Sequence, residues 1–155
     1  MFRLTLILAL LLLASTAAPA RAGGADLWAT VNICDTAAHP DGIGVRSSMP
    51  GGTRSTRLLV RFRVQYRDLT DGRWRYVRGA DSGWRRIGRG RRARESGWSF
   101  GVAGEGTRIL RGVVGYRWRR GGRIVRRARR VTQGGHHSTA GADPEDFSAA
   151  TCRLE

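Results

Sequence analysis

The stretch LLVRFRVQYR, residues 58–67, decides the fold, because apolar and polar side chains alternate along most of its length. One alternate set consists of Leu58, Val60, Phe62, Val64 and Tyr66. The other set consists of Leu59, Arg61, Arg63, Gln65 and Arg67. Successive side chains of a strand point to opposite faces of a sheet. The stretch therefore predicts a half-buried strand with one apolar face and one strongly basic face.

A second alternating stretch, residues 110–119, predicts a hairpin with the segment that follows it. Its apolar set is Leu110, Gly112, Val114, Tyr116 and Trp118. Gly121-Gly122 separates it from another extended run, residues 123–132, and suits a two-residue turn whose central positions need positive φ. With that turn, we expect Trp118 opposite Val125 and Tyr116 opposite Arg127.

Asp71-Gly72 has the same turn chemistry and predicts a second hairpin, between strands ending near Asp68 and beginning near Trp74. Five shorter stretches also have strand character, namely residues 27–34, 42–49, 83–87, 97–102 and 147–154. No window keeps apolar residues at helical spacing between helix caps, and residues 133–146 have the composition of a loop. We therefore expect one all-β domain, residues 23–155, built as an antiparallel β-sandwich of about seven to nine strands with almost no helix.

Two segments resemble an immunoglobulin-like module. Residues 61–77, RFRVQYRDLTDGRWRYV, look like the third strand and following hairpin of a fibronectin type III or related immunoglobulin-like domain. Residues 107–118, TRILRGVVGYRW, are similar to the penultimate strand of that domain, and the whole chain resembles secreted immunoglobulin-like proteins encoded by high-GC bacteria. The resemblance implies an immunoglobulin-like sandwich and no particular activity. The chain departs from the antibody pattern, because its two cysteines fall in the outermost expected strands.

The first 22 residues have the composition of an export signal. Arg3 precedes an apolar run from Leu4 through Ala14, and Ala20 and Ala22 occupy the two small positions that signal peptidase requires. As a helix the run would rise only about 16 Å, which is half of a bilayer's hydrocarbon core and too short for a membrane anchor. We expect a Sec-type signal peptide cleaved after Ala22 and a protein secreted to the extracellular space or the cell envelope, with membrane contact only during export.

The two cysteines, Cys34 and Cys152, lie near the two ends of the expected mature chain. An exported protein meets oxidising conditions, which favours a single disulfide. Closing so long a loop would stabilise the fold by about 4 to 5 kcal/mol in the chain-entropy model. The alternative is a reactive or metal-bound thiol pair, but neither cysteine has a CxxC partner or a histidine at ligand spacing.

The basic residues are the one feature that indicates a ligand. All 28 are arginine, against 12 acidic residues, and 25 of them fall within residues 46–130 together with only five acids. Arginine's planar fork suits sulfate, phosphate and carboxylate groups, and GRRARE (90–95) and VRRARR (125–130) resemble proposed glycosaminoglycan-binding patterns. The candidate anion-binding residues are Arg61, Arg63, Arg91, Arg92, Arg94, Arg126, Arg127, Arg129 and Arg130. The alternative is a solvated surface, because high-GC genomes encode arginine freely and basic faces discourage edge-to-edge association.

The aromatic residues leave a similar choice. Basic residues interleaved with aromatic rings are able to grip single-stranded nucleic acid. A secreted protein seldom meets that ligand. The strand pattern also predicts core positions for the rings of Trp74, Trp84, Trp98, Tyr116 and Trp118. We therefore expect core packing and no nucleic-acid partner.

No catalytic, cofactor or metal pattern is visible. The histidines, His39, His136 and His137, have neither metalloprotease spacing nor a triad order. A weak calcium site would be formed by Asp143, Glu145 and Asp146. An acidic loop that offsets the positive charge of the sheet is the simpler explanation. We expect no enzyme, no cofactor and no metal, with a small hydrolase as a minor alternative.

Two functional hypotheses follow. The first is a non-catalytic, secreted or envelope-associated binding or structural module of unknown ligand. The alternative is a dedicated binder of an anionic glycan, a teichoic-type cell-envelope polymer or extracellular DNA, acting through an arginine-rich sheet face.

Overall fold

The computed structural model describes residues 27–104 and 106–155, which form nine β-strands and no helix. The strands are β1 (Trp28–Thr36), β2 (His39–Met49), β3 (Arg57–Arg67), β4 (Trp74–Asp81), β5 (Arg85–Arg89), β6 (Arg94–Gly101), β7 (Arg108–Arg120), β8 (Arg123–Val131) and β9 (Cys152–Leu154). The expected signal peptide, residues 1–22, lies outside the described residues. Within the described ranges, no helix is long and apolar enough to cross a membrane.

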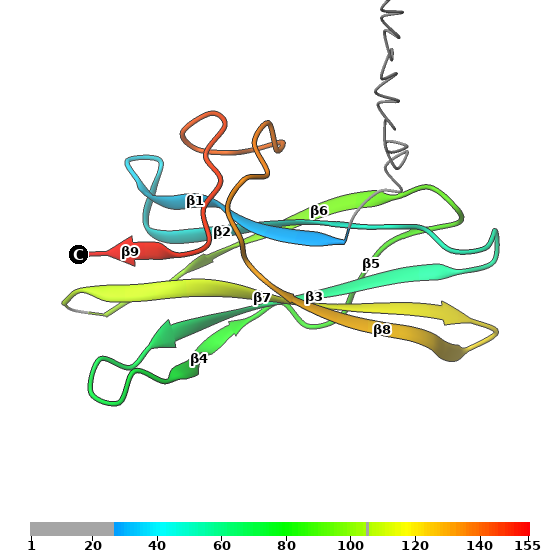
Figure 1. Ribbon diagram of the computed structural model, residues 1–155, viewed down its shortest axis with the longest axis horizontal. Helices are drawn as coiled ribbons and strands as arrows, with labels where there is room; N and C mark the ends of the chain where they lie inside the picture. Colours follow the sequence, from blue (N-terminus) through cyan, green and yellow to red (C-terminus); the bar gives the residue numbers. More distant parts are fainter. Residues whose placement is uncertain (1–26, 105) are drawn as a thin grey trace, which may run out of the picture.

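The strands form two sheets that pack face to face (Figure 1). A three-stranded sheet has the order β1-β2-β6, and a six-stranded sheet has the order β4-β3-β7-β8, with β5 paired to β3 and β9 paired to β7. All of these strand pairs are antiparallel. The expected all-β sandwich is confirmed.

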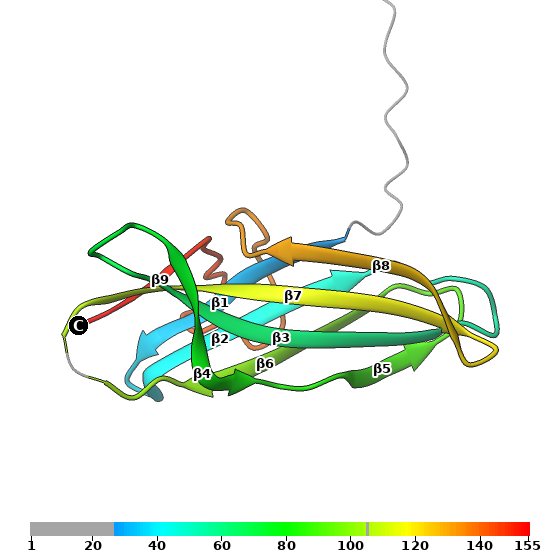
Figure 2. The same cartoon turned by 90° about the horizontal axis from the view of Figure 1, so that it is seen from below.

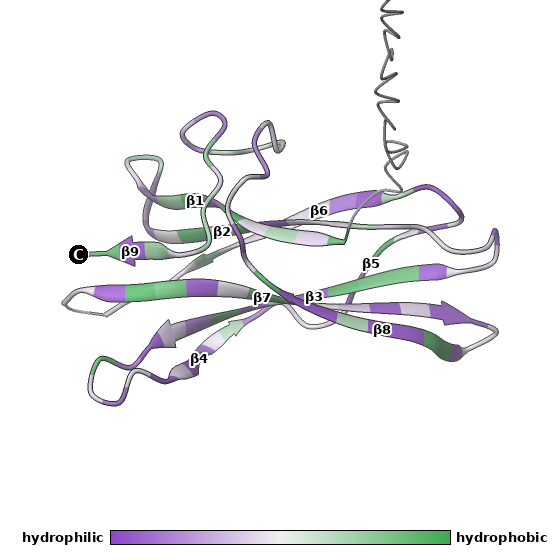
Figure 3. Ribbon diagram, in the orientation of Figure 1, coloured by the Kyte–Doolittle hydropathy of each residue, from purple (hydrophilic) through white to green (hydrophobic). Residues whose placement is uncertain are grey.

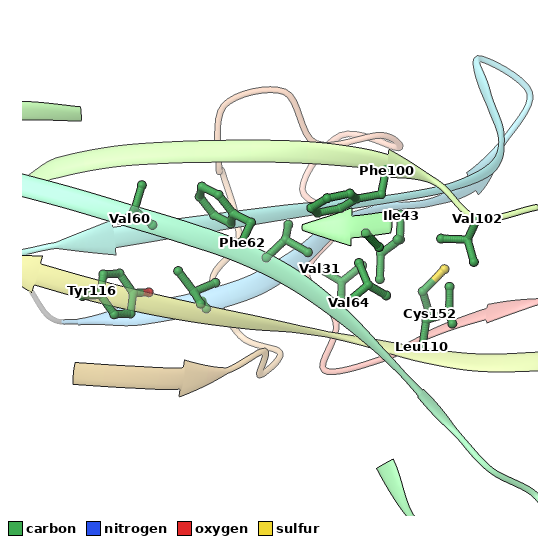
Figure 4. Packing of buried hydrophobic residues seen from close by; sticks show 14 of the residues in the cluster. Val31, Ile43, Val60, Phe62, Val64, Phe100, Val102, Leu110, Tyr116 and Cys152 are labelled. Atoms are coloured by element: carbon green, nitrogen blue, oxygen red, sulfur yellow. The ribbon is translucent and has the colours of Figure 1, made fainter. Parts of the chain in front are cut away.

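The core lies between the two sheets and follows the alternation in the sequence (Figure 4). β3 contributes Leu58, Val60, Phe62 and Val64, all fully buried. β7 contributes Leu110, Val114, Tyr116 and Trp118, and the three-stranded sheet faces them with Val31, Ile43 and Val45. Such burial of apolar area is the main stabilising contribution to folding.

The polar atoms of the two largest core rings have backbone partners. The hydroxyl of Tyr116 donates to the carbonyl of Trp28 (2.8 Å), and Nε1 of Trp118 donates to the carbonyl of Pro50 (2.9 Å). Burial raises the pKa of the Tyr116 hydroxyl, so this hydroxyl remains a neutral donor. The first bond joins β7 of the six-stranded sheet to β1 of the three-stranded sheet, and the second joins β7 to the connection that follows β2.

The disulfide expected between Cys34 and Cys152 is confirmed. The two residues are 118 positions apart in sequence, and their Cα atoms are 5.3 Å apart. Cys34 belongs to β1 in the three-stranded sheet, whereas Cys152 belongs to β9 in the six-stranded sheet. The disulfide therefore ties the two sheets together at one end of the sandwich.

The strand expected over residues 147–154 is much shorter than the pattern suggested. Only Cys152–Leu154 forms a strand, and Ala149 makes an isolated bridge to Val31. The preceding residues run as an irregular segment along β1, as expected for 133–146. Backbone hydrogen bonds join this segment to β1. The backbone amide of Gln133 donates to the carbonyl of Ala29, and that of Asp143 donates to the carbonyl of Asn32.

The β7–β8 hairpin has the expected turn but not the expected register. Gly121 and Gly122 have φ values of 54° and 81°, and Arg120 pairs with Arg123 around them. The expected pairs with Val125 and Arg127 were wrong, since Trp118 faces Arg126 and Tyr116 faces Ala128. A β-bulge between Trp118 and Arg119 is the cause, because it inserts one extra β8 residue into the pairing.

Candidate anion-binding surface

The outer face of the six-stranded sheet is lined with arginine. On β3 the alternation that buries Leu58 and Phe62 turns the odd-numbered residues outward, and the strand register carries this face across to β5, β7 and β8. Figure 2 shows these strands from below, and Figure 3 shows how hydrophilic residues run along β8. We call this set the outer arginine face; it consists of Arg57, Arg61, Arg63, Arg67, Arg86, Arg89, Arg111, Arg117, Arg119, Arg127 and Arg129.

Several of these arginines are direct neighbours on adjacent strands. Arg57 pairs with Arg89 on one side and with Arg119 on the other, and Arg117 pairs with Arg127. Like charges placed directly opposite each other in an antiparallel sheet destabilise it. The sheet thus carries a repulsion that water and salt relieve only in part.

Three arginines of this face stack on aromatic rings. The guanidinium carbon of Arg63 lies 4.3 Å from the ring centre of Tyr76, that of Arg111 lies 4.0 Å from Trp74, and that of Arg117 lies 3.8 Å from Trp84. Each guanidinium lies over a ring, and those of its N–H groups that remain exposed and without a protein partner are available to bond an anion.

The outward position of Trp74 and Trp84 corrects the expectation that they pack in the core. Trp74 lies on β4, an edge strand of the sheet, and pairs with the outward residue Arg67 of β3. Trp84 lies over Gly115, where an added Cβ would be only 3.2 Å from Cη2 of the indole. Because Gly115 has no side chain, the indole of Trp84 packs against the backbone of β7. Arg117 covers another part of the same indole.

Two further stacks lie at the edges of the core. Arg126 covers Trp118 (4.4 Å), and Arg85 covers Trp98 (4.1 Å). Trp118 is buried and Trp98 packs partly buried against the core, so both core expectations hold. These arginines close the edge of the sandwich and face the rings, not the outer surface.

One carboxylate accompanies the outer arginine face among the described residues. Asp81 pairs with Arg61, whose Nε donates to Oδ1 at 2.8 Å. The hydrogen bonds from Arg61 lower the pKa of Asp81, and the same bonds raise the pKa of Arg61. In the described part of the chain, no other arginine of this face has a carboxylate oxygen within 4.0 Å.

Arg111 shows how crowded the positive charge is. Its guanidinium sits on Trp74, and Nε donates to the side-chain carbonyl of Gln65 at 3.0 Å. Burial lowers the pKa of Arg111, and the nearby charge of Arg129 lowers it further. An anion bound here would offset the effect of the Arg129 charge.

The structure divides the sequence-predicted candidates into three groups. Arg61, Arg63, Arg127 and Arg129 lie together on the outer arginine face. Arg91, Arg92 and Arg94 lie in or next to the β5–β6 connection, at one end of the sandwich. Arg126 and Arg130 point to the other side of β8, where Arg126 covers Trp118 and Nε of Arg130 donates to the carbonyl of Leu27 (3.2 Å).

Seven arginines of the face were not among the candidates: Arg57, Arg67, Arg86, Arg89, Arg111, Arg117 and Arg119. Four of them had a usable signal, because Arg67, Arg111, Arg117 and Arg119 occupy the polar phase of the two alternating stretches. Choosing basic strings such as VRRARR instead selected residues from both sides of one edge strand.

The histidines and loop acids do not form a common site. The ring of His136 stacks on Trp28 at 4.7 Å, whereas Nδ1 of His137 lies 2.9 Å from the carbonyl oxygen of Asp146. His39 lies in β2, where it pairs with Thr36 of β1. Over residues 27–104 and 106–155, no group of three or more His, Cys, Asp or Glu side chains is placed to hold a metal ion.

The chain matches no protein-family model, no curated protein and no solved structure.

Proposed function

We propose that the protein is a non-catalytic binding module with an immunoglobulin-like fold, located outside the cytoplasm, whose ligand is a linear anionic glycan or cell-envelope polymer. The ligand lies on the outer arginine face. The observation that carries this proposal is the charge balance of that face, eleven arginines with Asp81 as the accompanying carboxylate among the described residues. The disulfide is compatible with an extracellular protein.

The spacing of the face suits a chain with repeating negative charges. Neighbouring strands lie about 4.8 Å apart, and outward residues on one strand recur about every 6.8 Å. The arginines therefore form a grid on which a polymer with charges several ångströms apart contacts guanidinium groups in succession. Such contacts release counterions from the polymer, which makes binding tight at low salt and weak at high salt.

The stacked rings favour an anionic chain over single-stranded nucleic acid. Recognition of unpaired bases needs ring faces onto which the bases stack. Here the rings of Trp74, Tyr76 and Trp84 already carry the guanidinium groups of Arg111, Arg63 and Arg117. The face offers oriented N–H donors, which bind sulfate, phosphate and carboxylate oxygens.

The stacks support a binding face over a merely solvated one. A free arginine side chain loses considerable rotamer entropy when it is fixed on a ligand. Three arginines of this face are already held by rings, so binding an anion costs them less.

The experiment compares two triple variants with the same charge change. One replaces Arg63, Arg111 and Arg117 with Gln, and the control replaces Arg73, Arg78 and Arg153, which are exposed and lie outside the face. Binding to heparin, as a model sulfated glycan, is measured over a range of salt concentrations. We expect the face variant to lower the slope of log K against log salt by about three, as each lost contact lowers it by about one.

The control variant should keep most of the affinity and the slope. Equal losses in the two triple variants would contradict the proposal, because net charge alone would then explain binding. Stronger binding to single-stranded DNA than to heparin of similar length would contradict the argument from the stacked rings.

A further inference from the structure

At one end of the sandwich, three connections meet around a cavity. The β2–β3 loop, the end of β5 and the β7–β8 turn lie at the same end in both views (Figures 1 and 2), and the amide of Gly52 donates to the carbonyl of Gly90 across them (2.9 Å). The cavity has a volume of about 300 Å³. It is lined by Ser55, Arg57, Arg89, Arg119, Gly121 and Gly122.

The three arginines of this cavity form one row across three strands. Arg57 of β3 pairs with Arg89 of β5 and with Arg119 of β7, so the backbones of the three residues are immediate neighbours. Within the described ranges, no carboxylate oxygen lies within 4.0 Å of any of the three guanidinium groups. Three arginines thus line a single hollow, and the described residues place no carboxylate beside them.

The rest of the lining leaves the hollow open and adds a donor. Gly121 and Gly122 hold the turn at positive φ, and a Cβ on either would meet nothing within 4 Å. A terminal nitrogen of Arg119 donates to the carbonyl of Gly122 (2.7 Å), which fixes this guanidinium beside the turn. The hydroxyl of Ser55 lies 3.2 Å from that of Thr53, within hydrogen-bond distance.

We propose that this cavity binds a single tetrahedral oxyanion with three unsubstituted oxygens, the group found in inorganic sulfate and phosphate and in their monoesters. Three guanidinium forks converge on three oxygens, and the Ser55 hydroxyl is a further donor. A bound anion offsets the repulsion among Arg57, Arg89 and Arg119. The anion is attracted to all three arginines, and its binding stabilises the row.

This inference deepens the proposed function, on which it rests for the source of the anion as a pendant or terminal group of the polymer. The cavity opens at the end of the outer arginine face, next to the row of Arg117 and Arg127. A polymer lying along the face would place one such group in the cavity and fix the register of the rest.

The test uses small anions, so it does not depend on polymer binding. The melting temperature is measured in sodium sulfate and in methyl phosphate, each against sodium chloride of equal ionic strength. Because a ligand that binds only the folded state stabilises it by mass action, we expect the melting temperature to rise with the logarithm of either anion concentration. Dimethyl phosphate, with two free oxygens, should bind at least about tenfold more weakly, a difference of about 1.4 kcal/mol.

Arg57→Gln should show two opposite effects. Without sulfate its melting temperature should equal or exceed that of the wild type, since the middle charge of the row is gone, and its response to sulfate should be lost. Arg89→Gln is a second variant with the same expected loss. Arg78→Gln, which lines a different cavity with Tyr66 and Leu110, should respond like the wild type.

Three results would overturn the site: no excess response to sulfate over chloride, an unchanged response in Arg57→Gln and Arg89→Gln, or equal affinity for methyl and dimethyl phosphate. Heparin binding that depends on Arg63, Arg111 and Arg117 would survive any of these results. Loss of that heparin dependence with an intact sulfate response would instead contradict the proposed function and leave the cavity as a site for a free anion.

Discussion

The two sheets treat their outer faces in opposite ways. On the three-stranded sheet the outer side of β1 is neutral and covered: Thr30 and Asn32 are buried, and the segment before β9 bonds to both of them. Arg46 of β2 and Glu95 of β6 form an ion pair on the same side, with 3.6 Å between Nη2 and Oε2. On the six-stranded sheet the outer side is open and lined with arginine. The same alternation thus supports two different surfaces. On the covered face, Thr30 and Asn32 use their side-chain polar groups for hydrogen bonds within the protein. The open charged face keeps its donors available for a partner.

Removing the disulfide that joins the two sheets should have the largest effect on stability. The Cys34–Cys152 disulfide joins β1 to β9, and replacing both cysteines with serine releases a loop with a sequence separation of 118. We expect a loss of about 4 to 5 kcal/mol in the free energy of unfolding, from the regained entropy of the unfolded chain. Urea denaturation of the variant and the wild type measures it. A loss below about 1 kcal/mol would show that the core alone holds the sheets together.

Adjacent residues of β3 should differ almost as strongly, because they point to opposite sides. Phe62→Ala empties a fully buried position and should cost about 3 to 5 kcal/mol. Arg63→Ala removes a half-exposed side chain and one ring contact and should cost about 1 kcal/mol or less. The same denaturation experiment checks both, and similar losses would contradict the assignment of the two faces.

The covered face should be sensitive to the loss of a single neutral hydrogen bond. The amide of Asn32 donates to the carbonyl of Gly141 at 2.9 Å while the residue is buried. Asn32→Ala leaves that carbonyl without this partner and should cost about 1 to 3 kcal/mol. Arg129→Gln on the open face should change stability by less than about 0.5 kcal/mol. Equal losses of stability at the two positions would contradict the difference between the covered and the open face.

Lowering the pH should protonate Asp81 on the open face, and this should have the smallest effect on stability. Hydrogen bonds from Arg61 hold the pKa of Asp81 below its usual value of 3.8. A carboxyl whose pKa is lowered by folding stabilises the protein above the unfolded pKa, and this contribution is lost as the pH falls through the folded pKa. We expect stability to decline below about pH 3.8 and to decline less steeply in Asp81→Asn. An identical pH profile for the two proteins would show that the Arg61–Asp81 pair adds nothing.

The core was predictable from sequence because it depends on the phase within a strand. Alternation in residues 58–67 alone identified the buried set of β3, and the glycine pair identified the β7–β8 turn. The register beyond the turn was not predictable, because a β-bulge at Trp118 shifted it by one residue. A bulge of this kind follows from twist and packing across the sheet and leaves no clear mark in the local pattern.

The candidate site was predictable only in part, since it depends on which strands are neighbours. The polar phase of β3 supplied Arg61 and Arg63, but the row of Arg89, Arg57 and Arg119 exists only because β5 and β7 flank β3. The outward positions of Trp74 and Trp84 were missed for a related reason. Strand alternation shows that two residues share a side, but an edge strand and a glycine on the neighbouring strand decide which aromatic rings remain outside.

The most direct test follows the arginine side chains themselves during titration with a sulfated oligosaccharide. Nuclear magnetic resonance of the Nε–H groups reports each guanidinium separately. The account predicts large shifts for arginines of the outer arginine face, led by Arg63, Arg111 and Arg117, and small shifts for Arg46 on the three-stranded sheet and for Arg78. Shifts of equal size at all exposed arginines, or shifts concentrated on the three-stranded sheet, would contradict it.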